Sequence, residues 1–284
     1  MSQTTVLITG STDGVGKLVA KRAAVAGARV LVHGRSDAKG RDTLGEIYRV
    51  APRSHVTYYR ADLASLDEVR RLADEVTAAH DRLDVLINNA GVGFGAPAGR
   101  RERSRDGHEL RFAVNYLAPF LLTHLLLPTL RRSAPSRIVN VASIGQAPLD
   151  FDDVMLTREY DGRQAYGQSK LALVMLTFDL AGALQGTGVT ANAIHPATLM
   201  NTNMVSEAGL RPHSTVEEGA EALFHLVTSP ELDGVSGRFF DGRREARAHP
   251  AACTKHNTSR GDTYGQHDEK AATESRSRAA APDW

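Results

Sequence analysis

Several features are scarce in this chain, and each scarcity excludes a class of protein. The 284 residues include one cysteine, Cys253, so no internal disulfide can form, which is typical of a reducing compartment. A formal net charge of +1 gives no basic field for nucleic acid. The N-terminus lacks a basic region followed by an apolar run, and the apolar stretch at 118–127 is interrupted by polar residues and a proline. We therefore expect a cytoplasmic protein with no nucleic-acid and no membrane partner.

His195 has no second ligand at metal spacing, so no metal is expected.

What the chain does have is a repeated alternation of strand-like and helix-like segments. Strands are expected near 6–9, 29–33, 55–60, 85–88, 136–143, 189–195 and 237–242, and helices near 17–26, 37–50, 65–80, 107–130, 166–185 and 216–228. Repeated β-α units predict an α/β, doubly wound Rossmann fold with a mostly parallel seven-stranded sheet and helices on both faces. Residues 1–251 would form this single domain. Residues 252–284 are polar and aperiodic, so we expect a disordered tail.

A glycine-rich turn joins the first strand to the first helix. Its sequence is Thr9, Gly10, Ser11, Thr12, Asp13, Gly14, Val15 and Gly16. Glycines in this setting permit a tight turn and let the backbone approach a pyrophosphate at the helix N-terminus. The pattern alone also fits an ordinary strand-to-helix turn.

The ends of the next strands carry further candidates for a dinucleotide site. The second strand ends in Gly34-Arg35-Ser36, where an acidic residue usually holds the ribose of NAD(H). A guanidinium can hold a 2′-phosphate instead, so Arg35, with Ser36 as a second donor, favours NADP(H). The alternative is an exposed arginine at a helix start. Asp62, followed by Leu63, could accept a hydrogen bond from adenine or could cap the next helix. Asn89, Ala90 and Gly91, after the fourth strand, would let backbone pass close to the ligand.

Tyr166 and Lys170 are four residues apart, on one face of a predicted helix. A neighbouring cation favours the phenolate and moves the tyrosine pKa toward neutrality. Ser143 is expected at the carboxyl end of a strand, which faces the same crevice as the glycine turn. Asn115 lies inside an apolar helix, where it is either structural or functional.

Together these residues resemble the short-chain dehydrogenase/reductase family, over roughly residues 4 to 245. The matching motifs are the glycine turn, Asn88 to Gly91, and the order Asn115, Ser143, Tyr166, Lys170. The segment before Tyr166 is similar to the retinol-dehydrogenase-like and carbonyl reductase branch. The resemblance implies that Tyr166 transfers the proton, Ser143 binds the substrate oxygen, Lys170 holds the nicotinamide ribose and lowers the Tyr166 pKa, and Asn115 positions a water.

The resemblance also assigns cofactor contacts to the loop after the sixth strand, at Pro196, Thr198 and Thr202. Three departures from the family pattern stand out, one of which is that the tail beyond about Ala251 matches no family motif. Ala197 replaces the usual glycine after the proline. Asp13 stands where NADP-preferring members often carry a basic residue, so Arg35 would have to act without that second cation.

The leading functional hypothesis is an NADP(H)-dependent oxidoreductase acting on a carbonyl or alcohol group of a fairly apolar small molecule. Phe94, Leu149, Met155, Met200 and Met204 are expected to reach its pocket. Two alternatives are a lyase, isomerase or cyclase that keeps the bound nucleotide, and a binding protein that senses NADP(H). The leucine-rich stretch at 117–127 could pack in the core or in a homodimer or homotetramer.

Overall fold

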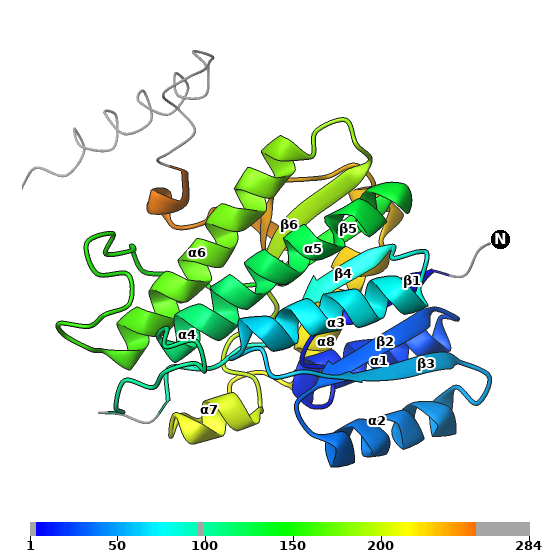
Figure 1. Cartoon of the computed structure of the whole chain (residues 1–284), viewed down its shortest axis with the longest axis horizontal. Helices are drawn as coiled ribbons and strands as arrows, with labels where there is room; N and C mark the ends of the chain where they lie inside the picture. The colour runs from blue at the N-terminus through cyan, green and yellow to red at the C-terminus, as the bar shows by residue number, and fades with distance from the viewer. Residues whose placement is uncertain (1–3, 96–98, 254–284) are drawn as a thin grey trace, which may run out of the picture. The chain divides into compact units, whose positions relative to one another are not determined.

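An eight-stranded sheet forms the centre of the computed structural model, which describes residues 4–95 and 99–253 (Figure 1). The strand order is β3-β2-β1-β4-β5-β6-β7-β8. The strands are β1 Thr5–Ile8, β2 Arg29–Gly34, β3 His55–Arg60, β4 Val85–Asn88, β5 Ser136–Val141, β6 Val189–His195, β7 Phe239–Asp241 and β8 Arg244–Ala246. β1 to β7 are parallel, and β8 pairs antiparallel with β7. The predicted Rossmann fold is confirmed, but the sheet has one strand more than predicted, because the short, charged edge strand β8 carries no apolar period.

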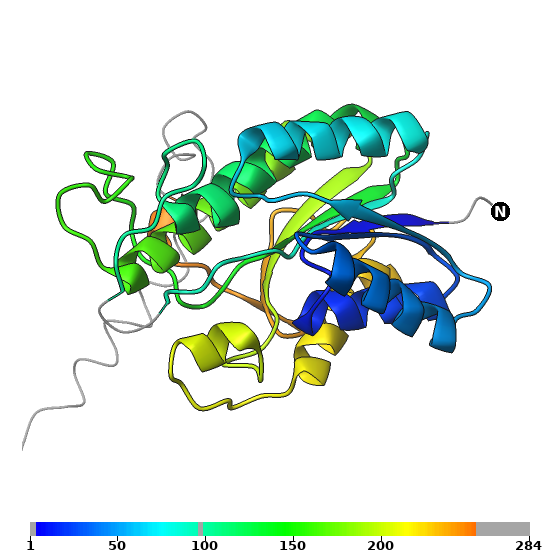
Figure 2. The same cartoon turned by 60° about the horizontal axis from the view of Figure 1, so that its bottom comes forward.

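Helices cover both faces of the sheet (Figure 2). The α-helices are α1 Gly14–Val25, α2 Asp37–Val50, α3 Leu66–Ala79, α4 Leu110–Phe112, α5 Ala118–Arg132, α6 Gly162–Ala183, α7 Asn203–Glu207 and α8 Val216–Thr228; η1 Ala113–Leu117 is a π-helix, and η2 Pro230–Leu232 and η3 Pro250–Cys253 are 3₁₀ turns. Figure 2 shows α1, α2 and α8 below the sheet and α3, α5 and α6 above it. The two layers bury separate apolar clusters.

The residues of β1 show how the sequence serves both layers. Val6 and Ile8 pack into the cluster that contains residues of α1 and α8, whereas Leu7 packs into the cluster with α3 and α5. Successive side chains of a strand point to opposite faces, so a parallel strand covered on both sides needs a continuous apolar run. Because β1 to β7 are parallel, their carboxyl ends lie at the same edge of the sheet, where ligands of open α/β folds bind.

The helix predicted at 107–130 is instead a composite of α4, η1 and α5. Pro119 lacks an N–H and cannot donate to the carbonyl of Asn115, four residues earlier, so regular helical bonding fails there. The π-helix η1 spans this point. The length and composition of Leu110–Arg132 would also suit a membrane-spanning helix, but 56% of its most apolar window is buried inside the fold, as in the core helix of a globular protein.

The described chain continues slightly past the predicted domain boundary. Ala252 is buried in η3 and packs with residues of α6 and β7. The rest of the predicted tail lies outside the described residues, so its disorder stays a prediction.

Candidate active site

A cavity of about 1190 Å³ lies at the carboxyl ends of the parallel strands. It extends from the glycine turn, past the ends of β2 and β4, to the start of α6. The predicted catalytic and cofactor-binding residues all line it except Ser11 and Asn115. One continuous space therefore joins the candidate nucleotide site to the candidate proton donor.

The glycine turn is shaped largely by its own packing. Gly10 has φ +65°, and a Cβ there would lie 2.8 Å from the Cα of Ala90. Ser11 is fully buried; its Oγ donates to the Ile8 carbonyl (2.7 Å) and accepts from the His33 N–H (3.0 Å). The Ser11 hydroxyl therefore holds the turn together and does not line the cavity, and a contact between Ser11 and the cofactor stays a prediction.

His33 is a cavity residue that the sequence interpretation missed. Its Nδ1 accepts from the Gly10 N–H (3.0 Å), and its Nε2 lies 3.2 Å from the Ala61 carbonyl. Burial lowers the His33 pKa to about 4, so the ring is neutral and Nε2 carries the proton. The sequence around His33, an apolar strand, did not indicate this role, because its partners are the backbone groups of Gly10 and Ala61, which only the fold brings close to it.

Two cations, Arg35 and Lys39, line the cavity near the end of β2. Arg35 is exposed at the cavity, and Ser36 caps α2 by accepting from the Lys39 N–H (3.4 Å). Lys39, in the first turn of α2, also lines the cavity and forms an ion pair with Asp13 (2.9 Å). The glycine turn itself supplies no basic residue, as expected, but Lys39 places a second cation at the cavity from a different element. Lys39 was missed because only the fold brings the first turn of α2 beside the glycine turn.

The loops after β4 and β3 contribute Asn89 and Asp62 to the cavity wall. The Asn89 side chain donates to the carbonyls of Thr9 (2.8 Å) and Gly10 (3.1 Å), which ties the end of β4 to the turn. Asp62 lines the cavity and accepts from the Ala64 N–H (3.1 Å). It does not cap α3, because Ser65 does so, which removes the alternative role for Asp62.

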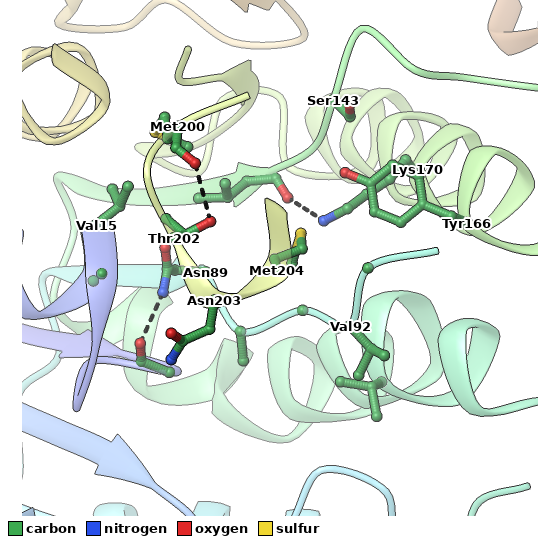
Figure 3. Close-up of a pocket in the computed structure, with 18 of the residues that line it drawn as sticks. Val15, Asn89, Val92, Ser143, Tyr166, Lys170, Met200, Thr202, Asn203 and Met204 are labelled. Atoms are coloured by element: carbon green, nitrogen blue, oxygen red, sulfur yellow. Dashed lines mark hydrogen bonds between the residues drawn. The ribbon is translucent and has the colours of Figure 1, made fainter. Parts of the chain in front are cut away.

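Ser143, Tyr166 and Lys170 lie together at the other end of the cavity (Figure 3). Ser143 follows β5, whereas Tyr166 and Lys170 project from α6, which Asp161 caps. The Lys170 Nζ donates to the Val141 carbonyl (2.8 Å) and lies 5.7 Å from the centroid of the Tyr166 ring.

Burial dominates the protonation of this pair. It lowers the Lys170 pKa to about 8, and it raises the Tyr166 pKa, with a hydrogen bond to Ser143 opposing the rise. The predicted lowering of the Tyr166 pKa by Lys170 is thus not seen in this structure, where the ammonium is directed to the Val141 carbonyl.

Asn115 lies behind the cavity wall, in the π-helix η1. Its Oδ1 accepts from the Val92 N–H (2.7 Å), while its Nδ2 donates to the Val92 carbonyl (3.0 Å) and to Ser169 Oγ (3.0 Å). A Cβ on Gly91 would lie 3.3 Å from Asn115 Oδ1 and 3.4 Å from Lys170 Nζ, so both side chains border that glycine. The side chain fixes the β4 loop against α6, which supports the structural alternative for Asn115.

The loop after β6 lines the cavity with Pro196, Thr198 and Thr202. Ala197 does not adopt a positive φ, so it takes the place of the family's glycine without backbone strain. Thr202 approaches Gly14, and the Asn203 side chain donates to Asp13 (3.0 Å).

Apolar side chains line the part of the cavity near Tyr166. Phe94 is among them, as predicted, because its ring contacts that of Tyr166. Met204 and Met200 also line the cavity, as predicted, but Met200 lies beside Val15 and Gly219. Leu149 and Met155 do not: Leu149 packs against a core cluster near α6, and the Met155 sulfur accepts from the Glu109 N–H (3.4 Å). Polar groups that can bind an oxygen and move a proton therefore stand beside an apolar space.

Comparison with known proteins agrees with this arrangement. The family model for short chain dehydrogenases matches residues 4–212. Human retinol dehydrogenase 13 is 38% identical over 269 residues, covering 87% of this chain and 79% of that protein. Human polyprenol dehydrogenase is 34% identical over 261 residues, covering 85% and 78%. The Pseudomonas aeruginosa RhlG/NADP active-site complex superposes with a TM-score of 0.69, at 27% identity over 85% of this chain and 95% of that one.

Proposed function

The chain belongs to the short-chain dehydrogenase family, in its retinol-dehydrogenase-like branch, and we propose that it is an NADP(H)-dependent oxidoreductase. The reaction is hydride transfer between the nicotinamide and a carbonyl or alcohol carbon of an apolar small molecule. One observation carries the proposal: Tyr166, Ser143 and Lys170 stand at one end of a cavity whose other end is the glycine turn.

The residues of the cavity fit a dinucleotide. Thr12 to Gly16 place the N-terminus of α1 at the cavity, where backbone N–H groups and the helix dipole favour a pyrophosphate. Arg35, Ser36 and Lys39 would hold the 2′-phosphate of NADP(H), because guanidinium and ammonium groups donate charge-assisted hydrogen bonds to phosphate oxygens. No carboxylate takes the usual ribose position after β2, which favours NADP(H) over NAD(H).

The side chains at the far end of the cavity supply the proton chemistry. A bound nicotinamide supplies or accepts the hydride. Tyr166 donates its phenolic proton to the carbonyl oxygen in reduction and removes the hydroxyl proton in oxidation. Ser143 donates a hydrogen bond to the same oxygen. Lys170 would hold the nicotinamide ribose, and an ammonium turned from the Val141 carbonyl toward the cavity would stabilise the phenolate.

The substrate is inferred to be apolar from two independent supports. Phe94 packs on the Tyr166 ring, and Met204 and Met200 line other parts of the same cavity. The names of the relatives denote enzymes of retinol and polyprenol, which are alcohols with long hydrocarbon parts. A flexible methionine lining adapts to differently shaped apolar chains.

Turnover of a graded panel of aldehydes and ketones tests the proposed function. The purified chain should oxidise NADPH with long-chain apolar aldehydes and be slower with short polar ones of the same functional group. The matching alcohols should reduce NADP⁺. If NADPH absorbance is unchanged across the panel, the chain is not a carbonyl reductase of this class.

A further inference from the structure

A polar network built around a buried ion pair lies beside the active site, on the segment between β4 and α6. It consists of the buried Glu109 and Arg111, the half-buried Tyr160 and the exposed Glu102, and we call it the Arg111 network. The side chain of Arg111 is 3% exposed and that of Glu109 is 0% exposed. A charged pair removed so completely from water is costly to fold unless its hydrogen bonds are satisfied. Its place beside the active site suggests a function there.

Glu109 satisfies its carboxylate entirely with groups of this region. Its Oε2 caps α4 by accepting a hydrogen bond from the Phe112 N–H (2.7 Å). Its Oε1 accepts from the Tyr160 hydroxyl (3.2 Å) and from Arg111 Nη1 (3.4 Å). Burial and the neighbouring carboxylate raise the Tyr160 pKa, so this phenol stays protonated and donates. The carboxylate thereby joins α4 to the segment that leads into α6.

Arg111 carries the network to the loop after β4. Its Nε donates to the Gly93 carbonyl (2.9 Å), its Nη2 pairs with Glu102 (3.3 Å), and its Cζ lies 5.9 Å from the centroid of the Tyr160 ring. Gly95 has φ +75°, and a Cβ there would lie 2.7 Å from Arg111 Nη2. The guanidinium is thus enclosed by the backbone on either side of Phe94.

Phe94 connects this loop to the reacting group. Its ring meets the Tyr166 ring edge-to-face, with centroids 5.6 Å apart and planes at 84°. Its carbonyl lies against the start of α6, since a Cβ on Gly162 would be 2.4 Å from that oxygen. Edge-to-face contact is a favoured aromatic geometry and restricts where the phenol can lie.

We propose that Arg111 is a positioning residue for Tyr166, acting through Phe94. By holding the Gly93 carbonyl and the Tyr160 ring at once, it fixes the Phe94 ring against the phenol and so fixes the phenolic oxygen relative to the substrate carbonyl. The inference rests on the proposed function, because it assigns Tyr166 the proton transfer. A displacement of about 1 Å at a reacting group can lower turnover by roughly a hundredfold.

The test is a double-mutant cycle on kcat for carbonyl reduction by NADPH. Arg111→Lys keeps the charge that balances Glu109 but loses the guanidinium fork, and Phe94→Leu removes the ring from Tyr166. We expect each single variant to lower kcat about tenfold or more without raising the KM for NADPH. Because Arg111 acts through Phe94, the double variant should lose little more than Phe94→Leu alone.

Arg137→Lys is the matched control. Arg137 is also largely buried, with its side chain 17% exposed, and donates to the carbonyls of Leu226 (2.9 Å) and Ser229 (2.8 Å), but it lies at the amino end of β5, away from the cavity. It should lose stability like Arg111→Lys yet keep kcat within about twofold. If Arg111→Lys does not fold, Tyr160→Phe, which removes one bond to Glu109, should lower kcat by about two- to tenfold.

Three results would overturn the inference: an unchanged kcat in folded Arg111→Lys or in its substitute Tyr160→Phe, losses that multiply in the double variant, or an equal loss in Arg137→Lys. A wild-type chain without turnover would instead refute the proposed function, and this inference with it.

Discussion

Removal of the Asp13 charge should tighten the binding of NADPH. The Asp13 carboxylate caps α1 by accepting from the Gly14 N–H (2.9 Å), and its other oxygen accepts from Lys39 (2.9 Å) and Asn203 (3.0 Å). The bond from Lys39 holds the Asp13 pKa below its usual value, so the group is charged at neutral pH. It therefore repels a 2′-phosphate and competes with it for Lys39. Asp13→Asn removes the charge but keeps a good N-cap.

The size of the effect follows from the exposure of the pair. The side chains of Lys39 and Asp13 are 56% and 53% exposed, and an ion pair this open to water contributes about 0–1 kcal/mol. Freeing Lys39 should therefore lower the dissociation constant of NADPH by at most about fivefold. NADH lacks the 2′-phosphate and should bind the variant as it binds the wild type.

Fluorescence titration of both nucleotides against both proteins measures this difference. The gain for NADPH should shrink at high salt, because exposed charges are screened. Equal changes for NADPH and NADH, or weaker NADPH binding, would refute the placement of the 2′-phosphate beside Lys39.

Three further predictions concern other parts of the cavity. Arg35→Ala should raise the dissociation constant of NADPH by about ten- to hundredfold and leave NADH nearly unchanged, because charge-assisted bonds are lost only with the former; equal weakening would remove Arg35 from this role. The kcat/KM for carbonyl reduction should fall as the pH rises above about 8, because burial lowers the Lys170 pKa to about 8 and the ammonium loses its proton there. A kcat/KM profile that is flat to about pH 10 would contradict this. Asn115→Ala should lower the free energy of unfolding, measured by urea titration, by about 1–3 kcal/mol, because the Val92 N–H and carbonyl lose their buried partner. A smaller loss would mean that water replaces the amide.

The fold was predictable because its signals are local and repeated. Apolar strands alternate with amphipathic helices, and the bounds of β3, β4, β6, α2 and α8 agree with those read from the sequence. The composite helix was not predictable in detail. Its π-helix depends on how the freed bonding around Pro119 is satisfied in three dimensions, and an apolar period cannot show that.

The candidate site was predictable where motif residues face the cavity directly, as at Ser143, Tyr166 and Lys170. Lys39 and His33 were missed because their partners are distant in sequence. The buried position of Ser11 could not be predicted, because the partners of its hydroxyl, the Ile8 carbonyl and the His33 N–H, are set by the packing of the turn. The cytoplasmic location, the lack of a membrane partner and the homodimer or homotetramer stay predictions.

The most direct test of the account is the turnover of Tyr166→Phe. This variant keeps the ring that packs on Phe94 and removes only the hydroxyl that would carry the proton. With NADPH and the best aldehyde of the panel, we expect kcat to fall by about a hundred- to ten-thousandfold, while the dissociation constant of NADPH is nearly unchanged. Turnover equal to that of the wild type would contradict the central role of Tyr166.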